Sequence, residues 1–227
     1  MKCNSLIKDY VSISIPVFVS DSLLALGTSA VAMVMGRIGT GFVSANSITV
    51  VIQQLTTVII QGICHASCIM TGHTLGHGER EKAQQQAWTF LILGLVVGIL
   101  GGGLIKVLSR PIIGLYNITP ETAQIAGELM DAIAFIVIFQ SMNSILTKGV
   151  LRGGGDTKFL MVADIIFLWA ASLPLGILAG LVWHLDAFWL YVFLKIDQIC
   201  KSIWCVFRLR SGKWIKTFSK EKMNHAQ

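Results

Sequence analysis

Long apolar runs alternate with short polar or glycine-rich joints along the whole sequence. A helix needs roughly 20 residues to cross a hydrocarbon core that is about 30 Å thick, and each run meets this length. The pattern predicts six membrane-spanning helices, at about residues 9–36, 44–72, 86–107, 121–147, 159–183 and 187–208. We therefore expect an all-α membrane protein in which these six transmembrane helices form one lobe.

The composition agrees with this expectation. Of the 227 residues, 54% are hydrophobic and 13% are charged, whereas an average soluble domain has about 25% charged residues. The first apolar segment is too long for a cleavable signal peptide. The five cysteines form no C-x-x-C pair, which favours a role as small packing residues over disulfides or a metal site. We expect a multi-pass protein of the cell inner (plasma) membrane.

The lysines and arginines predict an orientation. With the N-terminus inside, fourteen of them lie on the inner side and three on the outer side, and such an excess marks the cytoplasmic face. The inner set is Lys2, Lys8, Arg80, Lys82, Lys148, Arg152, Lys158, Lys201, Arg208, Arg210, Lys213, Lys216, Lys220 and Lys222. Both termini are predicted to be cytoplasmic, and residues 209–227 form a basic tail in which Trp214 is placed like an interfacial anchor. The net charge of +6 then needs no nucleic-acid partner.

Polar residues form stripes inside the first two predicted spans. Asp21 shares a helix face with Ser14 and Thr28, because these residues recur every seven positions. An ionisable residue in mid-span is costly and usually faces a cavity or a partner. The second span carries a continuous polar face made by Gln54, Thr57, Gln61, His65 and Cys68. Such a face either lines a water-filled cavity or joins helices through hydrogen bonds.

The later spans carry fewer polar groups. Gln140 and Asn143 form a polar face of the fourth span together with Thr147, and Glu128 and Asp131 near its outer end fit either a gate or a hydrated helix mouth. Asp197 and Lys201 are four residues apart and are expected to form a structural ion pair. Asp164 lies one to two turns into the fifth span, and Pro174 is expected to kink that span. Gly94, Gly98 and Gly102 form a small-residue ridge for helix packing.

Catalytic and metal chemistry find little support. His73 and His77 lie four residues apart without a third ligand, which argues against a zinc site. No nucleophile and base stand at a workable spacing. The sequence thus predicts no enzyme, no bound metal and no cofactor.

The stretch GVLRGGGDTKF, residues 149–159, joins the fourth and fifth spans. Its glycines, Gly153, Gly154 and Gly155, permit positive φ angles and a close approach of two helix ends. Asp156 is placed to cap the fifth span, and Arg152 suits the C-terminal end of the fourth. Any multi-span protein could use such a turn on its cytoplasmic side.

The same stretch resembles the LRGxGDT signature of the multidrug and toxic compound extrusion (MATE) family of efflux transporters. GHTLGHGEREKA is similar to the glycine-rich turn after the second helix of each MATE lobe, and SIPVF, FQSMNSIL and RLRSGKWIK also fit, in the right order along nearly the whole chain. The resemblance implies two six-helix lobes around a cavity that opens to alternate sides. Organic cations would be expelled in exchange for H⁺ or Na⁺.

The chain departs from this family in two ways. It corresponds to the second lobe alone, so the first lobe with its acidic cation site is missing. In the sodium-coupled branch, acids lie on the first and fourth helices of the second lobe. Asp21 matches the first of these positions, whereas the second, judged from FQSMNSIL, is Asn143 or a neighbour, which puts a complete sodium site in doubt.

Three functional hypotheses follow from the resemblance. The first is the second lobe of a transporter, with Asp21 and the stripe from Gln54 to His65 facing substrate or cation and a missing N-terminal lobe as partner. The second is a half-transporter that pairs with a second copy of itself, which would recreate the pseudo-twofold axis. The third is a truncated membrane remnant that does not transport, or a regulatory subunit.

Overall fold

The computed structural model describes residues 3–116, 118–183 and 185–215, and every regular element in this part of the chain is a helix. The π-helical segment η1 directly continues α4, and α5, η2, α6 and η3 follow one another without a break. The elements are α1 (Cys3–Ile38), α2 (Thr40–Gly76), α3 (Arg80–Leu115), α4 (Pro120–Ser144), η1 (Ile145–Leu151), α5 (Thr157–Ile165), η2 (Ile166–Ser172), α6 (Leu173–Ile177), η3 (Leu178–Val182), α7 (Ala187–Leu194) and α8 (Ile196–Arg210).

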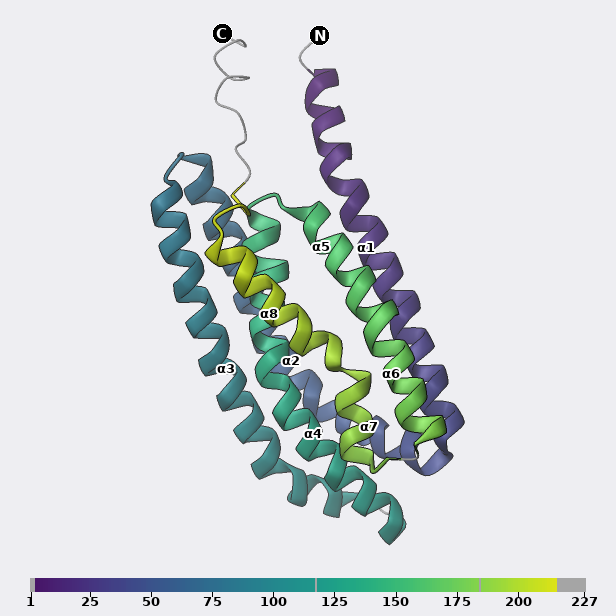
Figure 1. The fold of residues 1–227 in the computed structure, drawn as a ribbon. Helices are drawn as coiled ribbons and strands as arrows, with labels where there is room; N and C mark the ends of the chain where they lie inside the picture. The colour runs from purple at the N-terminus through teal and green to yellow at the C-terminus, as the bar shows by residue number, and fades with distance from the viewer. Residues whose placement is uncertain (1–2, 117, 184, 216–227) are drawn as a thin grey trace.

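The helices run up and down in one bundle (Figure 1). The start of α1, the α2–α3 turn, the joint between η1 and α5 and the end of α8 lie at the same end of the bundle. Four helical stretches of the described residues are long and apolar enough to cross a membrane, namely Thr40–Gly76, Arg80–Leu115, Pro120–Leu151 and Thr157–Gly180. The all-α membrane fold is confirmed, while six crossings and cytoplasmic termini stay predictions.

Two predicted spans are less regular than expected. The fifth contains the π-helical segments η2 and η3, with Pro174 between them in α6. The sixth divides at Lys195, whose φ of −116° and ψ of 15° lie outside the helical region. The helix axis changes direction at this break (Figure 1). As a result, α8 crosses the bundle at an angle of its own and brings its polar residues against α4 and α5.

The glycine ridge of α3 packs against α4, as the sequence predicted. A Cβ atom on Gly98 would lie 2.8 Å from Cα of Ile138, and one on Gly102 would lie 2.5 Å from the carbonyl oxygen of Ala134. Both neighbours are backbone atoms, which cannot move aside as a side chain could. The absence of side chains on this ridge therefore sets the short distance between α3 and α4.

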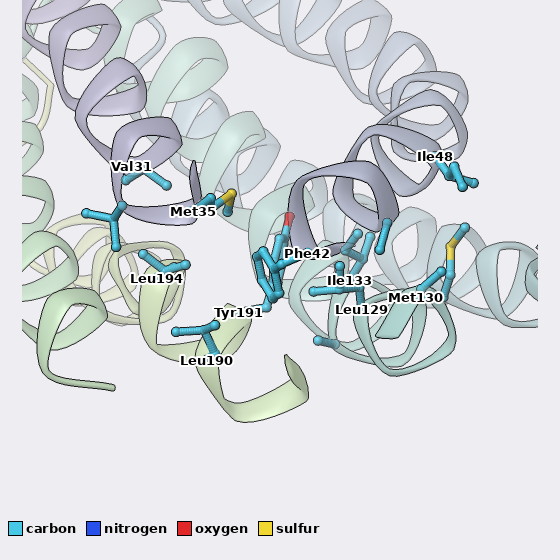
Figure 2. Packing of buried hydrophobic residues seen from close by; sticks show 14 of the residues in the cluster. Val31, Met35, Phe42, Ile48, Leu129, Met130, Ile133, Leu190, Tyr191 and Leu194 are labelled. Atoms are coloured by element: carbon cyan, nitrogen blue, oxygen red, sulfur yellow. The ribbon is translucent and has the colours of Figure 1, made fainter. Parts of the chain in front are cut away.

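An apolar cluster fills the end of the bundle where α1 ends and α2 begins. The cluster draws on α1, α2, α4 and α7, and its members interdigitate as buried side chains (Figure 2). The labelled members are Val31, Met35, Phe42, Ile48, Leu129, Met130, Ile133, Leu190, Tyr191 and Leu194. This packing fills the interior of that end of the bundle with apolar side chains.

Trp214 does not lie at the surface as an interfacial anchor, and that prediction is wrong. Its side chain is fully buried and packs on Gly154, where an added Cβ would lie 2.5 Å from the indole ring. The indole Nε1–H donates to Oε1 of Gln84 at 2.8 Å. The missing side chain at Gly154 leaves the room that the ring fills. Residues 216–227 of the predicted basic tail lie outside the described residues.

Candidate functional site

A cavity of about 310 Å³ lies among α1, α2, the end of α4 with η1, α5 and α8. Most of the residues that line it are polar or charged, although the bundle around it is mostly apolar. The polar and charged lining residues are Asp21, Thr28, Thr57, Gln61, Gln140, Asn143, Ser144, Thr147, Lys148, Arg152, Asp164, Gln198 and Lys201. A second hollow of about 330 Å³ shares Asp21, Gln61, Lys148 and Arg152 with it and adds Cys64, His65 and Cys68.

The structure brings together most of the cavity residues that the sequence predicted. Asp21, Gln61, Gln140 and Asn143 all line the first hollow, and His65 lines the second. The stripe on α2 therefore faces the cavity at Thr57 and Gln61 and continues to His65. What these side chains bind stays a prediction.

Gln54 lines neither hollow, and its side chain is exposed. The preceding residue, Gln53, points inward instead. Its Nε2 donates to Oε1 of Gln140 at 2.9 Å, and its Oε1 accepts from the Tyr191 hydroxyl at 3.5 Å. Gln53 thus joins α2 to α4 and α7 where the apolar cluster meets the cavity. The sequence pattern did not single it out, because a one-residue step on a helix turns the side chain by about 100°.

Arg152 is the residue of the GVLRGGGDTKF motif that lines the cavity. Its Nη2 donates to Oδ1 of Asp21 at 3.2 Å, and the two side chains are 33% and 53% exposed. Both residues line both hollows. This ion pair joins the end of η1 to α1 on the cavity wall, and both side chains stay partly exposed.

The other residues of the motif shape the turn. A Cβ on Gly153 would lie 2.7 Å from the carbonyl oxygen of Cys68 on α2, and Gly155 has a φ of 79°. Asp156 occupies the N-cap position of α5, but its side chain makes no capping hydrogen bond. The carboxylate is fully buried and accepts from Nε of Arg208 at 2.8 Å. Asp156 therefore holds the end of α8 to the turn, which corrects the predicted capping role.

Sequence reasoning missed a buried charge cluster in the cavity wall. Lys201 forms the expected ion pair with Asp197 on its own helix, with Nζ 3.4 Å from Oδ2, and it also lies 2.9 Å from Oδ1 of Asp164 on α5. The side chains of Lys201 and Asp197 are only 3% and 4% exposed, and that of Asp164 is 17% exposed. The separation of 37 positions between Asp164 and Lys201 gave no signal, because only the packing of α5 on α8 joins them.

A chain of hydrogen bonds extends this cluster to α4. Nδ2 of Asn143 donates to Oε1 of Gln198 at 2.7 Å, and Nε2 of Gln198 donates to Oδ2 of Asp197 at 2.8 Å. Oδ1 of Asn143 is buried and has no hydrogen-bond partner. Asn143 is 6% exposed and lines the cavity. A buried acceptor without a donor is costly in a protein interior, so this oxygen is suited to receive a hydrogen bond from a bound molecule.

The polar groups outside the cavity have simpler surroundings. Asp131 near the outer end of α4 forms an exposed ion pair with Lys106 of α3, and Glu128 accepts from Gln124 at 3.4 Å. The His73 and His77 rings meet edge to face with centroids 4.5 Å apart. Within residues 3–116, 118–183 and 185–215, no three metal-binding side chains of the His, Cys, Asp or Glu type come together.

Comparisons with known proteins place the fold and the family. The MatE family model matches residues 16–178. The chain is 25% identical over 217 residues to a probable multidrug resistance protein NorM of Xylella fastidiosa, covering 94% of this chain and 46% of that protein. It is 30% identical over 171 residues to the multidrug resistance protein MdtK of Photorhabdus laumondii, covering 74% of this chain and 36% of that protein. The chain thus spans less than half the length of these relatives.

Two solved structures share the fold. One is a MOP superfamily transporter from Pyrococcus furiosus, with a TM-score of 0.74 and 18% identity over 88% of this chain and 44% of that one. The other is an outward-facing multidrug resistance MATE family transporter, with a TM-score of 0.75, 18% identity and the same coverage. Because the family model covers most of the helical bundle, this chain belongs to the MATE family of transporters.

Proposed function

We propose that this chain supplies one lobe of a multidrug efflux transporter that expels organic cations in exchange for H⁺ or Na⁺ by alternating access. The observation that carries the proposal is the cavity, in which charged residues of α1, η1, α5 and α8 and glutamines of α2, α4 and α8 meet inside an apolar bundle. Ionisable groups in such a setting usually mark the path of a substrate or an ion. The names of the NorM and MdtK relatives and the half-length match support the same reading.

Asp21 is the proposed contact of this lobe with substrate or coupling ion. Its carboxylate is 53% exposed and lines both hollows, so a molecule in the cavity can reach it. Arg152 holds it by a single ion pair at 3.2 Å. An exposed pair of this kind contributes about 1 kcal/mol or less, which a bound cation can replace.

The test is efflux of a fluorescent cationic dye from bacteria that lack their own drug exporters. The chain is expressed in the membrane together with the preceding lobe of a MATE transporter, as wild type, Asp21→Asn and Asp131→Asn. Asp21→Asn should reduce the efflux rate about tenfold or more at equal membrane abundance, since it removes a charge from the cavity. Asp131→Asn is the matched control, because it removes an exposed carboxylate far from the lining. Equal efflux by Asp21→Asn and wild type would remove Asp21 from the mechanism.

A second candidate function is a half-transporter formed by two copies of this chain. The exposed side chains of Asp21, Gln54 and His65 on α1 and α2 favour it, because polar groups on helices of a membrane bundle need a polar partner or water. The chain expressed alone tests it directly. Dye efflux above the empty vector, together with a crosslinked band at twice the mass of the chain, would favour the paired form. A monomer without efflux would mean either that the chain needs a first lobe or that it does not transport.

A further inference from the structure

The cluster of Asp164, Lys201 and Asp197 is the most deeply buried group of charges on the cavity wall. One ammonium faces two carboxylates, at 2.9 Å and 3.4 Å. Lys201 therefore has two acidic partners, and Lys195 supplies a second positive charge that interacts with Asp197. Buried charges in a membrane helix are costly and are kept where they serve a substrate or ion path. The cluster thus calls for a role beyond joining α5 to α8.

The two carboxylates differ in what can reach them. Asp164 lines the cavity and is 17% exposed, whereas Asp197 is 4% exposed and does not line it. Asp197 is also fixed by the hydrogen bond from Gln198. A molecule in the cavity can therefore approach Asp164 only, and Lys201 would keep Asp197 as its partner if it released Asp164.

The unpartnered oxygen of Asn143 is a second, independent sign of a ligand. Oδ1 of Asn143 is a buried acceptor on the wall of the same cavity, and Nδ2 is already used by Gln198. A protonated amine fits both features, because its charge suits a carboxylate and its N–H groups suit a vacant amide oxygen. A quaternary ammonium would satisfy only the first.

The other charged residues near the cluster do not separate Lys201 from Asp164 or from Asp197. Lys195, at the break before α8, interacts electrostatically with Asp197 and with Lys201. Arg152, at the cavity wall, is paired with Asp21. Lys148 lines both hollows and has an exposed side chain.

We propose that Asp164 and Asn143 form a binding site for the protonated amine of a substrate, and that Lys201 is a tethered cation that occupies Asp164 until the amine displaces it. When the amine binds, Lys201 keeps its ion pair with Asp197. This deepens the proposed function, on which the identity of the ligand as a substrate rests. Lys201 acts as a specificity-determining residue, because only a cation that competes with an ammonium can enter.

Binding of dansylcadaverine, a fluorescent primary amine, to the purified chain in lipid nanodiscs tests the proposal by fluorescence anisotropy. Lys201→Gln should tighten binding about tenfold, because it removes the tethered competitor. Asp164→Asn should weaken binding about tenfold, and Asp164→Asn with Lys201→Gln should lose the gain. Asp197→Asn should also weaken binding, since Lys201 then has Asp164 alone. A merely structural cluster does not predict opposite signs for Lys201 and its partners.

Three controls make the result decisive. Asp131→Asn should bind like wild type, because its ion pair lies outside the cavity. The N-acetylated probe, which has no charge, should not bind. Replacing choline by Na⁺ as the buffer cation should weaken dansylcadaverine binding only slightly. Strong competition by Na⁺ would assign Asp164 to an inorganic cation and overturn the choice of an amine. Unchanged or weaker binding by a folded Lys201→Gln chain would overturn the tethered-cation role. If that variant does not fold, unchanged binding by Asp197→Asn would overturn it equally.

This assay and the efflux assay fail separately. If the binding affinities are as expected but cells show no efflux, the amine site is supported and the transport proposal fails. Efflux that depends on Asp21, with dansylcadaverine binding unaffected by Asp164→Asn and Lys201→Gln, would do the reverse.

Discussion

Helix α4 and its continuation η1 meet their neighbours in two opposite ways. On one side, Ala134 and Ile138 lie directly against the glycine ridge of α3, with no room for a Cβ. On the other side, Gln140, Asn143 and Thr147 line a polar cavity. The two faces belong to successive turns of one continuous helix. Close packing fixes one side of the helix firmly, which allows the other side to hold polar groups around an open space.

The largest effect on stability is expected from adding a side chain to the glycine ridge between α3 and α4. Gly102→Leu places a side chain where the backbone carbonyl of Ala134 stands 2.5 Å away, so α3 and α4 must separate. Overpacking of this kind costs about 3 kcal/mol. The measurement is the melting temperature of the purified chain in detergent. Gly103→Leu is the control, since a Cβ there meets nothing within 4 Å. Equal melting temperatures of the two variants would contradict the account of the ridge.

A smaller effect is expected from removing a polar group on the cavity face. Asn143→Leu deletes the donor to Oε1 of Gln198, and an unsatisfied polar group of this kind costs about 1–3 kcal/mol. The same melting experiment should show a fall smaller than that of Gly102→Leu. Ser144→Ala serves as the control, because Ser144 lies next to Asn143 on the same cavity wall. A stability equal to that of wild type would mean that the chain from Asn143 to Asp197 does not support the fold.

The smallest effect on stability is expected at the open edge of the cavity. Asp21 and Arg152 are both partly exposed, so a double-mutant cycle with Asp21→Asn and Arg152→Gln should give a coupling of about 1 kcal/mol or less. If ions reach both side chains, the coupling should fall further at high salt. A coupling of several kcal/mol that salt does not change would show that the pair is shielded and part of the core.

Local sequence predicted the helices and much of the packing face. The ridge of Gly94, Gly98 and Gly102 and the ion pair of Asp197 with Lys201 both follow from steps of three or four residues, and both are confirmed. Such pairs depend only on the period of one helix. Two predictions were wrong: the interfacial position of Trp214 and the capping hydrogen bond of Asp156. The Trp214 side chain bonds Gln84 and that of Asp156 bonds Arg208, and both partners lie far away in the sequence.

The residues of the candidate site also fall into two groups: those that local sequence predicted and those that only the packing of helices positions. The polar stripe of α2 and the mid-span Asp21 were visible as polar residues in apolar surroundings, so they were predicted. Asp21 and the stripe from Thr57 to Cys68 line the hollows, whereas Gln54 does not. Gln53, one residue from the predicted Gln54, was missed because its inward direction depends on how α2 is rotated against α4 and α7. Asp164 was noted without a partner, and the fold supplied Lys201.

The class of this protein could be predicted without a structure, because the length of its apolar runs, its low charge and the GVLRGGGDTKF turn are local properties of the chain. The sequence by itself also determined which residues are expensive in an apolar bundle. Only the tertiary structure decided which of these groups meet, through the break at Lys195 and the packing of α8 across α4 and α5. The reason is physical: helix period fixes contacts within four residues, whereas contacts between helices depend on their rotation and crossing.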